Sequence, residues 1–308
     1  MPIEPNDLAA LGSLGLFARG IVEGFITGLH KSPFHGFSVE FAEHRLYNSG
    51  EPIRNVDWKL FAKTDKLFVK RYEDETNLRC RIVIDQSSSM RFPYVKRNDW
   101  KHPDKLTFSV LCAASLIELM RRQHDAVGLD VFDTDIVRHT EDKTASVNVR
   151  TLFSMLEELL ANYDKDNRRE TAATACLHQI AEMSHKRSLV VIFSDMFDKA
   201  PADELFAAIE HLRYNKHEVI LFNVHDEILE QNLGFDDKPH TFIDLESGES
   251  LRLNPADVRQ EYAEIMAERK KALVSHCLQY QVDYVDADIN EKFDKVLTAY
   301  LVKRNSIR

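Results

Sequence analysis

Two short apolar runs that each lead to an aspartate are the feature that most limits how this chain can fold. The run Ile82-Val83-Ile84 leads directly to Asp85, and residues 189–193 lead through Ser194 to Asp195. A run without polar alternation is typical of a strand that is buried on both faces of a parallel sheet. Such sheets bind ligands beyond the carboxyl ends of their strands, where the strand order reverses. The two aspartates are therefore expected at a binding site.

Amphipathic segments lie between further apolar runs, so strands and helices are expected to alternate. We expect strands near residues 127–132, 219–222 and 282–285, and an edge strand within 133–146. We expect helices near residues 105–122, 152–160, 172–184 and 291–303, one beginning at Pro201, and one capped by Asn254 that ends near residue 278. This alternation predicts an α/β fold with a doubly wound, mainly parallel sheet flanked by helices, of the Rossmann type. A β-hairpin insertion is expected near residues 240–253.

The N-terminal part of the chain has other patterns. Apolar residues at helical spacing predict a helix over residues 11–29, and Gly24 lies in a row of glycines that would allow close backbone approach. We expect this helix to pack on its own domain, the alternative being a face for lipid or a partner. Alternation within residues 36–78 predicts a small antiparallel β segment. The expected domains are 1–78, the helix and β-rich segment, and 79–308, the α/β domain.

Composition limits the partners and the location. The chain has 308 residues, 44% of them hydrophobic, and a formal net charge of −10, so it can bury a large core but lacks the basic face that nucleic acid requires. Arg19 and Glu23 interrupt the most apolar stretch, so we expect no membrane span. The four cysteines lie far apart and follow no secretory signal, which predicts reduced thiols and a cytoplasmic protein.

The Asp-x-Ser-x-Ser pattern after the first apolar run carries the donor atoms for a hard cation. Alternate residues of an extended segment point to one side, so Asp85, Ser87 and Ser89 can converge while the intervening residues point away. With a threonine and Asp195, these oxygens could fill most of the octahedral shell of Mg²⁺. Only two carboxylates would then face the ion. It should therefore attract an outside anionic oxygen, such as a Glu or Asp side chain of a partner.

Two other interpretations of this pattern stay open. Asp85 could cap the following loop in a metal-free structural scaffold, with the serines bonded to nearby backbone. The chain could also be a Mg²⁺-dependent phosphohydrolase of the haloacid-dehalogenase type, whose nucleophilic aspartate likewise ends the first strand of a doubly wound sheet. That class has a second acid two residues later. Ser87 stands at that position here, which favours a non-enzymatic protein.

The loop at residues 91–104 combines aromatic and basic side chains, including Tyr94 and Trp100. Exposed aromatics beside cations would suit a protein contact at the rim of the site. The alternative is a loop whose aromatics pack inward.

Several segments resemble known families. Asp85-Gln86-Ser87-Ser88-Ser89-Met90 resembles the first motif of the metal-ion-dependent adhesion site (MIDAS) of von Willebrand factor A domains. Thr171 and Ser194-Asp195 resemble its second and third motifs. Residues 32–41, 54–59 and 68–77 resemble the domain-of-unknown-function 58 proteins, and this resemblance runs over nearly the whole chain.

The resemblance implies a von Willebrand factor A-like domain that binds a divalent cation, Mg²⁺ or Mn²⁺. The implied metal ligands are Asp85, Ser87, Ser89, Thr171 and Asp195, the aspartates directly or through water. Thr174 is a second candidate for the threonine, because the motif here lacks the usual glycine and following acid. Proteins of this family are thought to serve as adaptors for MoxR-type AAA+ ATPases. The implied partner is therefore such an ATPase or its client, offering a Glu or Asp carboxylate.

Overall fold

The computed structural model describes residues 13–31, 44–46, 68–70, 78–94, 100–161, 168–198 and 200–307. Two compact units make up the chain, Met1–Phe25 with Leu78–Arg308 and, separately, Ile26–Asn77. In the smaller unit, β1 (His44–Leu46) pairs antiparallel with β2 (Phe68–Lys70), which confirms the small antiparallel β segment. Residues 37–41, which carry part of the alternation within 36–78, lie outside the described ranges. The expected domain boundary between residues 78 and 79 stays a prediction, because most of residues 32–77 also lies outside them.

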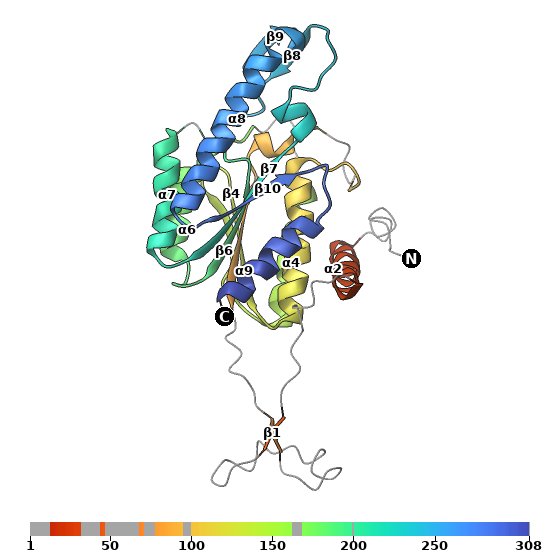
Figure 1. Ribbon diagram of the computed structural model, residues 1–308, viewed down its shortest axis with the longest axis vertical. Coiled ribbons are helices and arrows are strands. Elements are labelled where there is room, and N and C mark those ends of the chain that lie inside the picture. The colour runs from red at the N-terminus through yellow and green to blue at the C-terminus, as the bar shows by residue number, and fades with distance from the viewer. Residues whose placement is uncertain are drawn as a thin grey trace. The chain divides into compact units, whose positions relative to one another are not determined.

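A six-stranded sheet forms the centre of the larger unit (Figure 1). Its strands are β3 (Arg79–Asp85), β4 (Ala126–Phe132), β5 (Ile136–His139), β6 (Leu189–Ser194), β7 (Glu218–His225) and β10 (Asp283–Asp288). They lie in the order β10-β7-β6-β3-β4-β5, and all pairs are parallel except that of β4 with the edge strand β5. The predicted α/β fold with a mainly parallel, doubly wound sheet is confirmed.

The strand order reverses beside β3. The chain runs from β3 outward through β4 to β5, then returns to β6 on the other side of β3 and continues to β7 and β10. Ile84 of β3 is level with Phe193 of β6, so Asp85 and Ser194 follow at the same height on neighbouring strands. Doubly wound sheets bind their ligands at this reversal.

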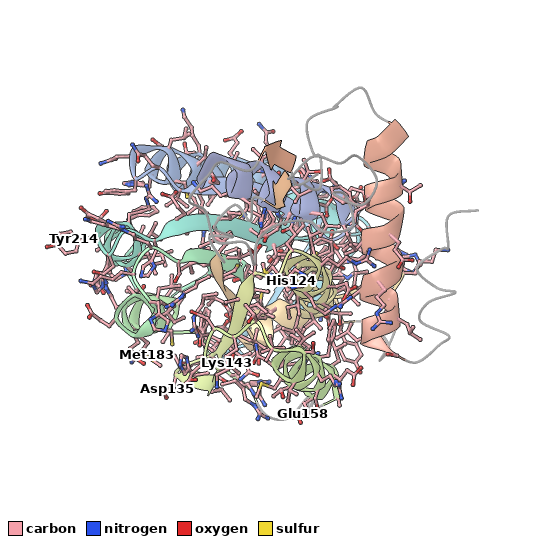
Figure 2. All side chains as sticks on the ribbon, turned by 90° about the horizontal axis from the view of Figure 1, so that it is seen from below. His124, Asp135, Lys143, Glu158, Met183 and Tyr214 are labelled. Atoms are coloured by element: carbon pink, nitrogen blue, oxygen red, sulfur yellow. The ribbon has the colours of Figure 1, made fainter. Side chains whose placement is uncertain are left out.

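Helices cover both faces of the sheet. The helices α6 (Ala173–Met183), α7 (Ala202–Tyr214) and α8 (Pro255–Gln279) share one buried apolar cluster with side chains of the sheet. Three other helices pack elsewhere against the sheet: α4 (Lys105–Arg122), α5 (Ser146–Ala161) and α9 (Asp294–Ile307). Figure 2 views the edge where α6 ends at Met183 and α7 ends at Tyr214. The carboxyl ends of the parallel strands lie at the opposite edge.

Helix α4 is buried almost all round. Every residue from Lys105 to Met120 is buried, because α4 lies between the strands, α5 and α9. Its bounds are those predicted from the sequence. Asp104 caps its first turn, with a side-chain oxygen 2.6 Å from the backbone nitrogen of Thr107. The N-terminus of α4 lies near the carboxyl end of β6, because the ammonium of Lys105 contacts Asp195, the residue after that strand.

Helix α2 (Leu14–Lys31) begins in the larger unit and packs on it through Leu14, Phe17, Ala18 and Val22. The Phe17 ring meets the rings of Trp100 and Phe293 edge to face, at 5.1 and 5.7 Å between centroids. The helix therefore packs within this chain, as expected, but its described contacts are with the larger unit and not with the domain 1–78 to which it was assigned. A Cβ atom at Gly24 would meet nothing within 4 Å, so the expected close approach is wrong at that position. Among the described residues, no helix has the length and apolar character that crossing a membrane requires.

A hairpin of β8 (His240–Ile243) and β9 (Ser250–Leu253) is inserted between β7 and α8, as predicted. Asn254 caps α8, as predicted, by accepting a hydrogen bond from the backbone of Ala256. A π-helical turn, η3 (Glu227–Gln231), precedes the hairpin and was not predicted.

Candidate metal-binding site

A buried carboxylate and two hydroxyls come together where β3 ends. Oδ1 of Asp85 accepts a hydrogen bond of 2.9 Å from the backbone N–H of Ser87. The hydroxyls of Ser87 and Ser89 lie 3.0 Å apart, with Ser89 in the short 3-10 turn η2 (Ser88–Arg91). Asp85 and Ser87 are both buried. The predicted convergence of these three side chains is therefore present.

The intervening side chains bind elsewhere, as the alternation predicts. Gln86 donates a 2.8 Å hydrogen bond to Asp133. Ser88 forms two hydrogen bonds with Arg169, one from its backbone N–H at 2.9 Å and one accepted by its hydroxyl at 2.8 Å. These bonds tie the loop before α6 to the loop after β3. The first of these loops carries the candidate Thr171.

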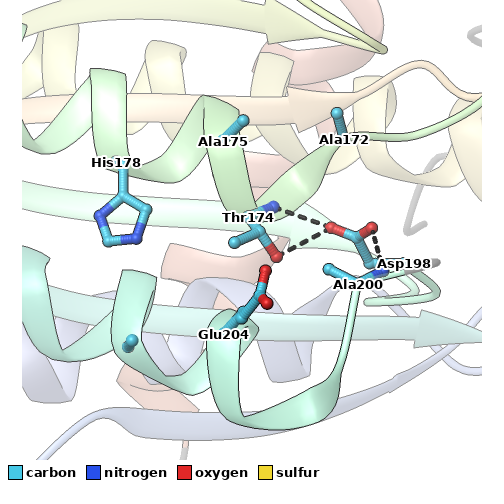
Figure 3. Close-up of a pocket in the computed structure, with 8 residues that line it drawn as sticks. Ala172, Thr174, Ala175, His178, Asp198, Ala200 and Glu204 are labelled. Atoms are coloured by element: carbon cyan, nitrogen blue, oxygen red, sulfur yellow. Dashed lines mark hydrogen bonds between the residues drawn. The ribbon is translucent and has the colours of Figure 1, made fainter.

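Of the two candidate threonines, only Thr171 lies beside Asp85. Its hydroxyl is 3.5 Å from Oδ2 of Asp85, a long contact. Thr174 instead directs its backbone N–H and its hydroxyl to Oδ2 of Asp198, each at 2.9 Å. Figure 3 shows that pair in a separate groove lined by α6 and α7. The geometry thus groups Thr171, not Thr174, with the serines.

Strand β6 contributes Ser194 to the site rather than the aspartate after it. The Ser194 hydroxyl lies 2.8 Å from Oδ2 of Asp85. Asp195 faces elsewhere: Oδ2 accepts from the ammonium of Lys105 at 2.8 Å, and Oδ1 from the N–H of Phe197 at 3.1 Å. Both oxygens of Asp195 are therefore engaged by the protein itself. Sequence reasoning missed the Ser194 contact, although strand alternation should place neighbouring residues on opposite sides.

A buried lysine lies next to the site and was also missed. The ammonium of Lys105 contacts Asp195 at 2.8 Å and Glu230 of η3 at 2.6 Å. Burial alone would lower the pKa of Lys105, but the two carboxylates raise it above its ordinary value. The sequence offered only a weak signal, since a lysine in the first turn of a helix is mildly disfavoured by the helix dipole and is stabilised by a nearby carboxylate.

The surroundings of Asp85 disfavour the ionised form of its carboxyl group. Burial and, to a lesser extent, the negative charge of Asp195 raise the pKa of Asp85 to about 7, although hydrogen bonds from Ser87 and Ser194 lower it in part. Among the described residues Asp85 has hydrogen-bond donors but no ion-pair partner. A bound cation would supply the missing positive charge.

A third carboxylate was not foreseen by sequence reasoning. Glu246, in the turn of the β8–β9 hairpin, accepts a hydrogen bond of 3.3 Å from the backbone N–H of Thr171. Burial raises the pKa of Glu246, and the hydroxyl of Ser89 and the N–H of Thr171 lower it in part. Glu246 is 75 residues from Thr171 in the chain, so no local pattern could reveal the contact.

The donor set fits a hard cation rather than zinc. Among the described residues, no group of three or more His, Cys, Asp and Glu side chains is placed to hold a metal ion. The oxygens near Asp85 belong chiefly to serine and threonine hydroxyls, which are not among those four residue types. Mg²⁺ and Mn²⁺ prefer oxygen ligands and retain water where protein ligands are few.

In the loop at residues 91–104, one aromatic side chain packs inward and another is exposed, so each of the two interpretations of this loop holds for one residue. Trp100 packs inward with 8% of its surface exposed, whereas Tyr94 is 58% exposed. Residues 95–99 lie outside the described ranges. Tyr94 is therefore an exposed aromatic side chain, whereas the inward packing holds for Trp100.

A family model described as "Protein of unknown function DUF58" matches residues 43–272, well over half of the chain. Uncharacterized proteins of Mycobacterium bovis and Mycobacterium tuberculosis are 32% identical over 89 residues, which is 29% of this chain and 28% of each relative. The chain thus matches less than a third of the length of these curated relatives.

Solved structures resemble this chain only distantly. The BatB protein of Bacteroides thetaiotaomicron is 12% identical, with 75% of this chain and 98% of that chain covered and a TM-score of 0.44. An aerotolerance-related membrane protein of Bacteroides fragilis is 16% identical with the same coverage and a TM-score of 0.43. The proximal thread matrix protein 1 of the mussel byssus, with a zinc-occupied MIDAS motif, is 12% identical over 49% of this chain and 38% of its own, with a TM-score of 0.33. TM-scores below 0.5 carry no conclusion about fold or function.

Proposed function

This chain belongs to the family of proteins of unknown function DUF58, and we propose that it is a cytoplasmic, non-enzymatic, metal-dependent protein-binding module. In this proposal Mg²⁺ or Mn²⁺ is held, as in the MIDAS of a von Willebrand factor A domain, by Asp85, Ser87, Ser89, Thr171 and Asp195. The metal binds a Glu or Asp carboxylate of a protein partner. We propose a MoxR-type AAA+ ATPase, or a client of one, as that partner.

The observation that carries the proposal is the meeting of three chain segments at Asp85. Its carboxylate contacts Ser87 of its own loop, Thr171 of the loop before α6, and Ser194 at the end of β6. Hydroxyls and a buried carboxylate at one point match the oxygen preference of Mg²⁺. In such a site Asp195, whose oxygens already bind Lys105 and Phe197, would act through water.

The residue two positions after Asp85 supports a binding role over catalysis. This residue is Ser87, a serine rather than an acid, and its hydroxyl lies 3.0 Å from the hydroxyl of Ser89. Without an acid there, a nucleophilic aspartate would lack the proton donor that a phosphohydrolase of the haloacid-dehalogenase type uses.

Metal binding is tested by thermal unfolding with added Mg²⁺ or Mn²⁺. A ligand that binds only the native state stabilises it by about 2.7 kcal/mol at one hundred times its dissociation constant. We expect this shift in the wild type and its loss in Asp85→Asn and Ser87→Ala. Ser115→Ala is the matched control, because that buried hydroxyl bonds only the backbone of its own helix.

Partner binding is tested with a purified MoxR-type ATPase from the same host. We expect capture by the wild type, loss of capture in EDTA, and loss in Ser87→Ala but not in Ser115→Ala. Capture that survives both EDTA and Ser87→Ala would show that the metal is not the contact.

A metal-free scaffold is a second candidate that two contacts favour. The backbone of Ser87 bonds to Asp85 as in a simple loop cap, and Lys105 already neutralises Asp195. The thermal titration separates the two candidates, since a scaffold shows no shift with either metal in the wild type.

A further inference from the structure

The turn of the β8–β9 hairpin is built to hold Glu246 in one position. Oδ1 of Asp244 accepts hydrogen bonds from the backbone N–H groups of Glu246 at 2.7 Å and Ser247 at 2.9 Å. Gly248 closes the turn in the left-handed region, with φ of 77°, and donates its N–H to the carbonyl of Asp244 at 2.9 Å. The backbone around Glu246 is therefore ordered by the hairpin itself.

This turn delivers the Glu246 carboxylate to the candidate metal site. Oε2 accepts from the backbone N–H of Thr171 at 3.3 Å. Oε1 is buried and has no partner with hydrogen-bond geometry, although the hydroxyl of Ser89 lies near enough to lower the pKa of Glu246. Two of the predicted metal ligands, Ser89 and Thr171, thus flank this carboxylate.

The position is unfavourable for a carboxylate without a cation. Asp195 acts on both Asp85 and Glu246 as a like charge. The ammonium of Lys105 is bound to Asp195 and Glu230. A buried carboxylate oxygen without a donor costs free energy that water would relieve if the side chain turned outward. The guanidinium of Arg168 contacts the Ser247 carbonyl of this turn at 3.4 Å, yet Oε1 of Glu246 has no hydrogen-bond partner.

We propose that Glu246 is a further ligand of the bound metal and takes, from within the chain, the position that a partner's carboxylate would occupy. The inference rests on the proposed metal-binding function and extends it to the state of the free protein. Glu246 would then join Asp85 as a second carboxylate in direct contact with the ion, with Asp195 acting through water, and the ion would be less electrophilic. A partner carboxylate must displace the hairpin turn before it can bind the metal.

The experiment measures Mn²⁺ binding by the full chain with two readouts, calorimetry and the water-proton relaxation that counts water on bound Mn²⁺. Glu246→Gln keeps an oxygen for the N–H of Thr171 but removes the charge, and Glu246→Ala removes the ligand. Glu249→Gln and Glu249→Ala are the matched controls, because Glu249 is an exposed glutamate in the same hairpin. None of the four changes touches the core.

We expect Mn²⁺ to bind about tenfold more weakly to both Glu246 variants, since ligand charge and number set the affinity of such sites. We expect one more bound water in Glu246→Ala, and wild-type behaviour in both Glu249 variants. Wild-type affinity and water count in the Glu246 variants, with binding still lost in Asp85→Asn, would overturn this inference alone. Failure of the wild type to bind Mn²⁺ would overturn the proposed function together with it.

Discussion

The hydroxyl of Ser194 lies 2.8 Å from Oδ2 of Asp85 and joins the carboxyl ends of β6 and β3 across 109 residues of chain. This contact places Ser194, rather than Asp195, on the side of the first strand's carboxylate. Asp195 turns instead toward Lys105. The proposed site therefore has the buried carboxylate of Asp85 at its centre with hydroxyls around it, while the carboxylate of Asp195 is ion-paired with Lys105.

The two candidate threonines are expected to respond differently to truncation. Thr171→Ala removes a hydroxyl beside Asp85 and should reduce the stabilisation by Mn²⁺. Thr174→Ala should leave that stabilisation intact but lower the free energy of unfolding by about 1 kcal/mol, because it removes a hydrogen bond to Asp198. Urea unfolding with and without Mn²⁺ measures both effects. Loss of the Mn²⁺ effect in Thr174→Ala would reverse the assignment.

Replacing the buried lysine should destabilise the metal-free protein. Lys105→Met leaves the buried Asp195 and the partly buried Glu230 without the ammonium that pairs with them, and breaking a buried pair in this way costs about 3–5 kcal/mol. Urea unfolding in EDTA gives the change. Lys186→Met, at an exposed lysine, serves as control and should stay within about 0.5 kcal/mol of wild type. A Lys105→Met protein as stable as the control would show that this pair does not support the fold.

Two glycine substitutions are expected to change the free energy of unfolding in opposite directions. A Cβ at Gly128 would lie 2.3 Å from Oδ1 of Asp142, which is ion-paired with Arg81 at 2.7 Å. Gly128→Ala should therefore destabilise by about 1–3 kcal/mol. Gly24→Ala meets open space on a helix and should stabilise by up to about 1 kcal/mol. Thermal unfolding of both variants tests the contrast, and equal shifts would contradict it.

His217 should make stability fall in mild acid. It is fully buried, and burial lowers its pKa below the ordinary 6.5, although backbone carbonyls oppose this in part. As pH falls below about 6.5, the unfolded chain takes up the proton first, so folding stability is lost until the folded pKa is reached. For one proton, the free energy of unfolding changes by at most about 1.4 kcal/mol per pH unit.

The measurement is urea unfolding of wild type and His217→Gln between pH 7.5 and 5. We expect the wild type to lose more stability than His217→Gln over this range, because glutamine does not titrate. Parallel pH profiles would contradict a neutral, buried His217.

The sequence by itself determined the features that depend on near neighbours. The apolar runs predict β3 and β6 because burial on both faces leaves a continuous apolar stretch, and the helical spacing of apolar residues predicts α4. The Asp-x-Ser-x-Ser motif is likewise local, although Ser89 reaches Ser87 from the 3-10 turn η2 rather than from an extended segment. Capping by Asn254 and the start of α7 after Pro201 are likewise local.

Only the tertiary structure decided which distant residues meet at Asp85. Thr171 rather than Thr174 lies beside it, Ser194 rather than Asp195 bonds to it, and the hairpin brings in Glu246. These contacts follow from strand register, from the hydrogen bonds between Ser88 and Arg169, and from the turn of the hairpin. Each depends on segments about 75 to 110 residues apart in sequence, and no periodicity within one element records such a pairing.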